Sequence, residues 1–424
     1  MGQTSRAGRQ GRRGRIALAG LLALVMVLGG CAYASGSEPS RALCIATDLP
    51  LVGASGADGK AARNGADLAI SQARLDGGYT VAARGFDDTL NGQPSTAAAT
   101  MNVISAASDD CVLALVGPLQ DALAASAMPL AANSGLPIVS PGTASPGLTR
   151  AATAGYYGLD YAALRPAGKP NVFFRLPVPD DGQAAAAARV AALDGRSQAY
   201  VVDDGQIYGR ALATFFTQAY QALGGTVVGT AELTTTAPPP AAALAALVRA
   251  SGAQVIYYGG GATGGGAALC QALGIADPGG PPALPMLGAS GIAGDAGFVS
   301  AATASAAEGT EATRAAPDAA GLTGANADQF RASYRARFDA DPTSASVLGY
   351  DAANVVVSAL QALIAAGARP TRENVRQRLA TMTFQGLEGA IAFDSNGDNS
   401  GTRAVSLYVV HGGAWVYLKP VSAG

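Results

Sequence analysis

Residues 112–142 read VLALVGPLQDALAASAMPLAANSGLPIVSPG, and the fold class is predicted from this segment. The apolar run at residues 112–116 predicts a buried strand that stops at Gly117-Pro118. Residues 122–133 predict a helix, and Gly135 closes it because glycine readily adopts the left-handed conformation found after many helix ends. Residues 136–139 predict the next strand. Strand, helix and strand of these lengths form a β-α-β unit with parallel strands.

The same alternation extends in both directions. Upstream, the pattern predicts strands at 43–47 and 79–86 and helices at 60–74 and 94–107. After a strand at 172–176 the pattern restarts, with strands at 199–202, 226–230, 254–258 and 285–287 and helices at 183–193, 208–223, 241–250 and 265–273. We therefore predict an α/β protein of two Rossmann-like, doubly wound lobes joined near residues 177–179.

The last part of the chain has no complete alternation of its own. It predicts helices at 327–338, 346–366 and 372–379 and a β ribbon of 404–410 with 414–418. These elements do not form a sheet of their own and must add to the sheets of the two lobes. We therefore expect the chain to cross between the lobes again and to form a hinge of several strands.

Composition narrows the class of protein. The chain has 424 residues, enough for about two domains. Its 28 Lys and Arg against 30 Asp and Glu leave a net charge of −2, without the basic stripe that nucleic acid requires. Its 56 Gly and 23 Pro follow no G-x-y period, which excludes a collagen-like chain and a wholly disordered one.

The N-terminus predicts export. Five arginines between residues 6 and 15 precede an apolar run at 16–28, too short to span a bilayer comfortably. The run ends in Leu28-Gly29-Gly30-Cys31, which resembles the bacterial lipobox, in which the Cys is acylated and becomes the mature N-terminus. The alternative is a plain secretory signal with an incidental Cys. No later segment offers the ~18 consecutive apolar residues of a membrane helix.

If the protein is exported, its other cysteines are in an oxidising compartment where they can form disulfides. Cys44 and Cys111 stand at the starts of two predicted strands, the first and third of the first lobe. In a doubly wound sheet of order 2-1-3 those strands are neighbours, so an oxidising compartment allows a disulfide between the two. Cys270 lies in an apolar helical stretch and is expected to be a buried free thiol. With His411 as the only histidine and no Cys-x-x-Cys, we expect no metal site.

Short motifs along the chain resemble one family by their order and spacing. They are Leu49-Pro50-Leu51-Val52-Gly53, Arg63-Asn64-Gly65-Ala66, Asp87-Asp88, Gly117-Pro118, Ser140-Pro141, Ser145-Pro146-Gly147-Leu148-Thr149, Phe174-Arg175, Asp180-Asp181-Gly182-Gln183, Asp203-Asp204-Gly205-Gln206-Ile207-Tyr208-Gly209, Tyr257-Tyr258-Gly259-Gly260, Gly349-Tyr350-Asp351-Ala352, Phe384-Gln385-Gly386 and Phe393-Asp394-Ser395-Asn396-Gly397-Asp398. From about residue 43 to 416 the chain resembles the type I periplasmic solute-binding proteins, in particular the branched-chain amino acid (Leu/Ile/Val) branch of ABC importers.

The resemblance implies a ligand caught in the cleft between two lobes, which close on it about a hinge. The N-terminal residues predict a signal peptide at 1–30 and a linker at 31–40, and the resemblance implies a first lobe of 41–176 plus 310–386 and a second lobe of 177–309 plus 387–424. The later crossovers are expected near 308–313 and 386–390.

The same resemblance implies a function without catalysis and without a cofactor. We expect an extracytoplasmic, monomeric receptor for a small polar solute, held at the membrane by a lipid anchor and recognised by ABC permease subunits, with no nucleic-acid partner. A ligand sensor that passes its closed form to a membrane signalling partner needs the same cleft and remains the alternative. A secreted hydrolase is a distant third, and permease and ATPase genes nearby would favour transport.

Three motifs are also found in proteins with other functions. Residues 259–264 match G-x-G-x-x-G, but the acidic residue expected ~20 positions on is missing from any strand end, since Asp277 lies in a Pro/Gly loop. We expect a tight strand-to-helix turn that lends backbone N–H groups to a ligand. His411 precedes Gly412-Gly413 in a predicted hairpin turn, and no G-x-S-x-G elbow accompanies it. Residues 394–398 lack the later Glu of a calcium loop and predict a turn.

We identify candidate site residues by comparing the positions of the motifs in this chain with those of the family that it resembles. The resemblance implies that Asp121 replaces a common Ser, that Ala144 replaces a Thr, and that Ser290 stands where an acidic residue often meets the ligand's ammonium. Tyr208 matches a ligand-facing aromatic, and Asp58 lies in the first loop. We expect a cleft lined by Asp58, Asp121, Gly142, Thr143, Tyr208, Gly261 and Ser290.

The two acidic residues set the expected ligand class. They would repel a carboxylate or attract a cationic or hydroxyl-rich group, so Leu, Ile or Val is not assured. The alternative is that either carboxylate caps a helix or stays solvated at the rim, because Asp121 directly precedes a predicted helix.

The lipobox yields a direct prediction. Acylated Cys31 should hold the protein in the membrane fraction, and Cys31→Ala should release it, because each buried methylene of the acyl chains contributes about 0.8 kcal/mol to membrane binding. Cell fractionation followed by immunoblotting measures this. Wild-type protein free in the medium would disprove the anchor.

Overall fold

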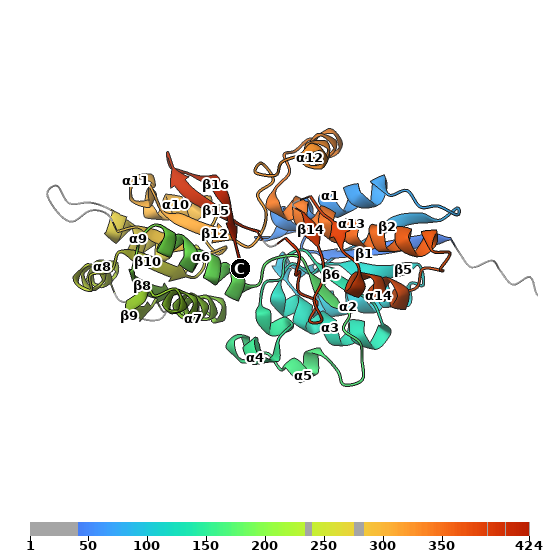
Figure 1. The fold of residues 1–424 in the computed structure, drawn as a ribbon, viewed down its shortest axis with the longest axis horizontal. Helices are drawn as coiled ribbons and strands as arrows, with labels where there is room; N and C mark the ends of the chain where they lie inside the picture. The colour runs from blue at the N-terminus through green and yellow to red at the C-terminus, as the bar shows by residue number, and fades with distance from the viewer. Residues whose placement is uncertain (1–40, 234–239, 275–283, 388, 403, 424) are drawn as a thin grey trace, which may run out of the picture. The chain divides into compact units, whose positions relative to one another are not determined.

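The computed structural model describes residues 41–233, 240–274, 284–387, 389–402 and 404–423. Cys31, the predicted signal peptide, the linker and Asp277 lie outside the described residues. Two sheets organise the described chain, as the sequence predicts (Figure 1).

The first sheet is parallel, and its strands lie in the order β2 (Thr80–Asp87), β1 (Ala42–Leu49), β5 (Val112–Val116), β6 (Ile138–Ser140) and β7 (Phe173–Arg175). The predicted order 2-1-3 of its first three major strands is confirmed. Its helices are α1 (Gly56–Gln72), α2 (Thr96–Ser108), α3 (Asp121–Ser134), α13 (Ser344–Ala365) and α14 (Arg372–Thr381). Shorter elements are β3 (Thr89–Leu90), β4 (Gln93–Pro94), η1 (Pro146–Leu148), α4 (Ala151–Ala154), η2 (Gly155–Tyr157) and α5 (Tyr161–Leu164).

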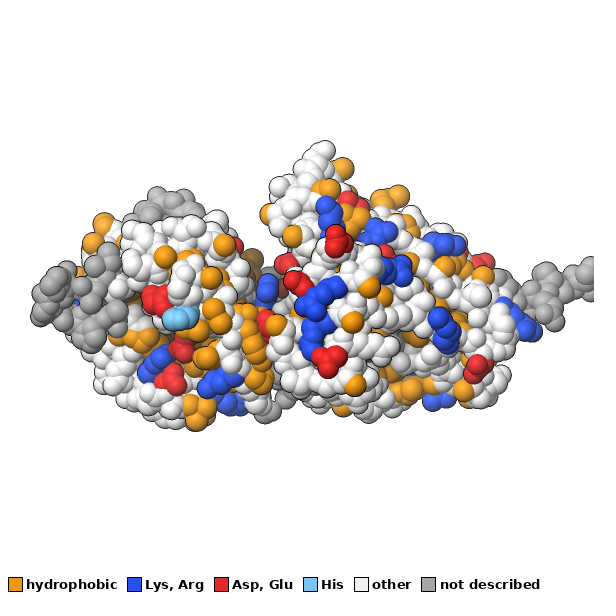
Figure 2. Space-filling model, turned by 90° about the horizontal axis from the view of Figure 1, so that it is seen from above, with side chains coloured by type: hydrophobic (Ala, Val, Ile, Leu, Met, Phe, Trp, Pro, Cys, Tyr) orange, Lys and Arg blue, Asp and Glu red, His pale blue; other side chains and the backbone are white. Residues whose placement is uncertain are grey.

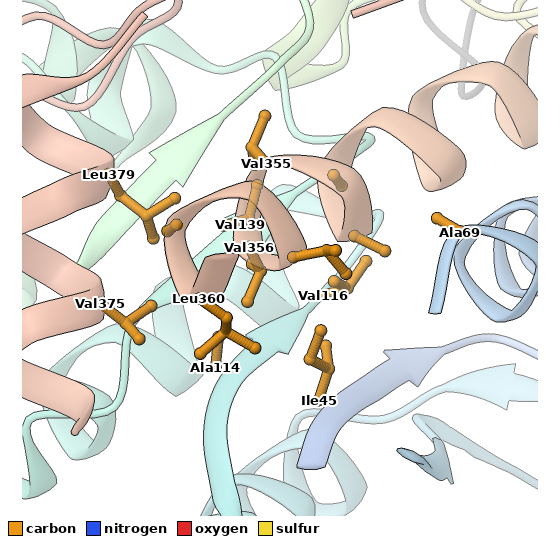
Figure 3. Close-up of a cluster of buried hydrophobic side chains, with 14 of the residues drawn as sticks. Ile45, Ala69, Ala114, Val116, Val139, Val355, Val356, Leu360, Val375 and Leu379 are labelled. Carbon is orange, nitrogen blue, oxygen red and sulfur yellow. The ribbon is translucent and has the colours of Figure 1, made fainter. Parts of the chain in front are cut away.

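Both faces of this sheet are buried, and β1 shows how. Leu43 and Ile45 join a core with α1, α13 and α14, whereas Cys44 and Ala46 point to the opposite core with α2 and α3, because successive strand side chains alternate between faces. Figure 3 shows part of the first core, with side chains from the sheet and from α13 and α14 packed together. By length and composition α13 could cross a membrane, but 67 % of its most apolar window is buried in the protein.

The second sheet has the order β16 (Ala414–Ser422), β15 (Ala404–His411), β12 (Glu311–Arg314), β11 (Met286–Gly288), β10 (Val255–Gly259), β8 (Gln198–Asp203) and β9 (Thr226–Glu232). The two C-terminal strands are antiparallel and the others parallel. Its helices are α6 (Asp180–Leu193), α7 (Ile207–Ala222), α8 (Ala241–Ala250), α9 (Gly266–Gly274), α10 (Ala296–Ala302) and α11 (Ala304–Ala307). Alternate side chains again enter two cores: Val201 packs with α6 and α7, and Val202 packs with α8 and α9.

The chain passes between the lobes three times, after β7, after β12 and after β14. The first passage follows β7, which ends at Arg175. The predicted limits at 310 and 386 are wrong, because Ala312 of β12 is buried in the second lobe's core, whereas Ile391 of the hairpin β13 (Phe384–Gln385) and β14 (Ala390–Ile391) is buried in the first. Between these passages α12 (Ala325–Phe338) packs against α1 and α13.

Arg175 is the last residue of β7, where the first passage starts, and its side chain is completely buried. Its Nε donates to Asp398 Oδ1 at 2.8 Å, its Nη2 to Thr149 Oγ1 at 2.7 Å and its Nη1 to the carbonyl of Ser145. A buried charge is stable only when it is paired and hydrogen-bonded. Arg175 therefore ties the third passage and the loop after β6 to the first.

Charge on the surface is mixed. On the face that Figure 2 presents, basic and acidic side chains are interspersed among apolar and neutral ones, as the scattered charges of the sequence imply. His411 lies exposed at the β15–β16 turn and contacts Glu308.

Cys44 and Cys111 form the predicted disulfide, with their Cα atoms 5.0 Å apart, and Cys270 is a buried free thiol. The bridge closes a segment with a sequence separation of 67 residues. Chain-entropy arguments for a loop of that length give a stabilisation of roughly 4 kcal/mol.

We expect Cys44→Ser/Cys111→Ser to unfold at markedly lower denaturant concentration, because its unfolded state regains the freedom of that loop. In a Cys31→Ala background, denaturing alkylation without reductant should modify one thiol, measured by intact mass. Three modified thiols would show that the disulfide does not form.

Candidate functional site

A cavity of about 310 Å³ lies among the loops that follow the strands of both sheets. Its described lining residues are Ser55, Asp58, Leu119, Gln120, Asp121, Pro141, Gly142, Ala144, Pro177, Asp180, Tyr208, Ser290, Arg314, Ala315, Ala316, Ser344, Ala345 and Leu348. They stand after β1, β5, β6, β7, β11 and β12 and at the starts of α7 and α13. Ligands of open α/β sheets bind at the carboxyl ends of strands, where helix N-termini also point.

Asp121 connects the start of α3 with the loop after β6. Its Oδ1 accepts the N–H groups of Ala144 at 3.0 Å and Ser145 at 3.1 Å. It does not cap its own helix, whose N-cap is Gln120. Burial raises the pKa of Asp121, while the two N–H donors and the charge of Arg175 oppose that rise.

Asp180 opens α6, immediately beyond the first passage, and is only 1 % exposed. Its backbone N–H donates to the carbonyl of Ala144, whose own N–H donates to Asp121. Asp121 and Asp180 are therefore both hydrogen-bonded to the backbone of Ala144. The Tyr157 hydroxyl donates to Asp180 Oδ2 at 2.6 Å, whereas Oδ1 is buried without a partner. Burial first, and then the charge of Asp121, raise the pKa of Asp180 to about 7.

Neutral polar side chains form other parts of the wall. The Gln120 amide donates to Ser55 Oγ at 2.9 Å and joins two first-lobe loops. Ser290 Oγ accepts from the Gln183 amide at 2.8 Å and from the N–H of Ala315. Tyr208 stands in the first turn of α7, and burial together with the charge of Asp180 raises its pKa, so the phenol keeps its proton.

Two further residues shape the wall. At Gly142 a Cβ would lie 2.7 Å from Leu119 Cα, so only glycine lets these loops approach so closely. Arg314 is the one basic residue among the described lining residues. Its side chain forms no hydrogen bond or ion pair with the described part of the chain.

Five of the seven predicted ligand-binding residues meet at the cavity: Asp58, Asp121, Gly142, Tyr208 and Ser290. Asp58 is exposed in the first turn of α1, at the rim.

Thr143 and Gly261 are not among the described lining residues of this cavity. The Thr143 hydroxyl is completely buried and donates to Ser140 Oγ at 2.8 Å. The N–H of Gly261 donates to Asp204 Oδ2 at 2.9 Å. The glycine-rich turn therefore uses this N–H group to hold its own loop rather than a ligand.

The sequence interpretation missed Asp180, Gln120 and Arg314. Asp180 was visible as an acidic residue directly after the proline-rich passage between lobes, at the N-terminus of a predicted helix. Arg314 had no such signal, because β12 was not predicted.

Comparisons with known proteins agree with this architecture. A sequence model of the family described as periplasmic binding protein matches residues 45–414. No curated protein matches the chain. A leucine-binding protein, LivK, from Thermotoga maritima is 23 % identical, with a TM-score of 0.66, over 90 % of this chain and 99 % of its own.

Two other solved structures are similar. LivJ from Streptococcus pneumoniae, a branched-chain amino acid transporter substrate-binding protein in complex with isoleucine, is 21 % identical over 90 % of this chain and 99 % of its own, with a TM-score of 0.67. An ABC transporter solute-binding protein from R. palustris in complex with benzoate is 20 % identical over 90 % and 98 %, with a TM-score of 0.64. At these identities the likeness shows the fold.

The buried carboxyl of Asp180 should make the empty protein less stable at high pH. Because its pKa is raised on folding, the folded state keeps a proton that the unfolded state loses above about pH 4. The contribution of Asp180 to the free energy of unfolding should therefore fall between about pH 4 and pH 7. Asp180→Asn should be more stable than wild type at pH 8 and similar at pH 4, measured by urea unfolding. A variant less stable than wild type at pH 8 would contradict this.

Proposed function

The chain belongs to the periplasmic binding protein family, and on that premise we propose that it is the extracytoplasmic solute receptor of an ABC importer. It binds a small polar solute in the cavity and delivers it to the permease without transforming it. The observation that carries the proposal is that one cavity is lined by loops of both sheets, with Asp121 on one side and Tyr208 and Ser290 on the other.

Closure of the two lobes is the proposed binding mechanism. A solute that contacts both lobes stabilises their closed arrangement relative to the open one, and the closed arrangement presents the surface that the permease recognises. The three passages between the sheets provide the hinge. The names of the similar structures support the transport role, since LivJ and the benzoate-bound protein are both ABC transporter binding proteins.

The proposal includes a lipid anchor at Cys31. It rests on the sequence alone, because Cys31 lies outside the described residues. An anchored, monomeric receptor would stay close to its permease at the membrane surface.

A ligand screen tests the receptor function. We expect one compound from a panel of branched-chain amino acids, aromatic acids, amines and sugars to stabilise the full-length protein, by about 2.7 kcal/mol at 100 times its Kd. Thermal unfolding measures the shift. Ala345→Trp, which fills the cavity from the first turn of α13, should abolish the shift while the protein still folds. A shift that survives this variant would place binding outside the cavity.

A further inference from the structure

The described cavity wall is acidic. It contains three carboxylates, those of Asp58, Asp121 and Asp180, against the single guanidinium of Arg314. Asp58 is exposed at the rim, whereas Asp180 is almost completely buried. The negative groups are therefore concentrated where the solvent screens them least.

The two inner aspartates, Asp121 and Asp180, both hydrogen-bond to the backbone of Ala144, the first through its carboxylate and the second through its backbone N–H. Asp121 accepts the N–H of that residue, and the N–H of Asp180 donates to its carbonyl at 2.9 Å. Asp121 uses Oδ1 for its two backbone bonds. Asp180 uses Oδ2 for Tyr157, and its Oδ1 is a buried acceptor without a donor.

No basic side chain of the described residues satisfies this pair. Arg175 lies near enough to influence both carboxyl groups, but its donors are used by Asp398, Ser145 and Thr149. An unpaired carboxylate at such a depth is costly, and a second one beside it adds repulsion. A positive group of a ligand placed beside the pair removes both penalties, whereas a ligand carboxylate in that position adds to them.

We propose that the solute is an organic cation whose positively charged nitrogen sits between Asp121 and Asp180. This inference rests on the proposed receptor function and specifies its ligand class. Asp180 Oδ1 accepts a hydrogen bond from the nitrogen or, for a quaternary nitrogen, contacts its positive charge. The aromatic ring of Tyr208 lines the same cavity and attracts cations. Leu348 and Ala345 provide apolar surface for the rest of the solute.

The charge of these groups makes binding depend on pH. The groups that face Asp180 are Asp121, Asp181, Arg175, Tyr157, Tyr208 and Tyr257, and those that face Asp121 are Arg175, Asp180, Tyr157 and Tyr208. Burial raises the pKa of each of the three tyrosines, so they keep their protons, and the two aspartates are the acidic groups of this set whose raised pKa brings their titration toward neutral pH. A cation binds their ionised form, and binding then releases a proton near neutral pH. Affinity for a cation should rise from pH 5.5 to pH 8.

Calorimetry of the full-length protein tests the ligand class with four probes: putrescine, choline, leucine and benzoate. We expect putrescine or choline to bind, at least about tenfold more tightly at pH 8 than at pH 5.5. Asp180→Asn and Asp121→Asn should each weaken that binding at least about tenfold, because each removes a charge and keeps the side chain's shape. Asp351→Asn is the matched control, since Asp351 is equally buried with a pKa raised to about 7 but does not line the cavity.

The outcomes separate this inference from the receptor function. Leucine or benzoate binding without either amine overturns the cation while leaving the receptor intact. An acid that binds more tightly as pH falls also overturns the cation alone, because neutral carboxyl groups would then be donating to that acid. Amine binding that both aspartate variants leave unchanged overturns the proposal as well. If none of the four probes binds, the cation is overturned, whereas the receptor function is decided separately by the wider panel of amino acids, aromatic acids, amines and sugars.

Discussion

The buried guanidinium of Arg175 is the constraint on which the site depends. It cannot be desolvated alone, so the fold surrounds it with Asp398 from the third passage and with oxygens of Ser145 and Thr149. Removing one partner of such a pair costs roughly 3–5 kcal/mol. Arg150 extends the network by a bidentate pair with Asp181, next to Asp180. The loop after β6 and the start of α6 are thereby fixed to one another, and with them the two carboxyl groups of the cavity.

Most of the fold could be predicted because its strands and helices carry strong local signals. Buried strands such as β5 are continuous apolar runs, and α3 ends at Gly135, whose φ is +66°. The later passages could not be located in the same way. The strand β12 is four residues long, has no alternation, and exists because β11 and β15 pair with it from either side. Its place is a tertiary effect, so the predicted limit at 310 was early.

The site residues also divide into those with a local sequence signal and those positioned by tertiary structure. Asp121, Gly142 and Tyr208 follow strands or open helices within recognisable motifs, and they line the cavity. Asp180 and Arg314 reach it because the chain passes between the sheets beside them, and only the passage beside Asp180 has a local signal, the prolines before it. Conversely, the polar groups of Thr143 and Gly261 satisfy Ser140 and Asp204 inside their own loops. Sequence position identifies which loop faces a cleft, but hydrogen-bond accounting decides which of its groups remain available to a ligand.

The central claim is that two neighbouring carboxyl groups without a basic partner, one of which has the unpaired oxygen Asp180 Oδ1, select the solute. A crystal structure of the protein with a bound amine tests it most directly. The account predicts the ligand's nitrogen within about 3 Å of Asp180 Oδ1 and close to Asp121, with Tyr208 beside it. A solute whose carboxylate or ring lies against Asp180, or one that binds away from the cavity, would contradict the account.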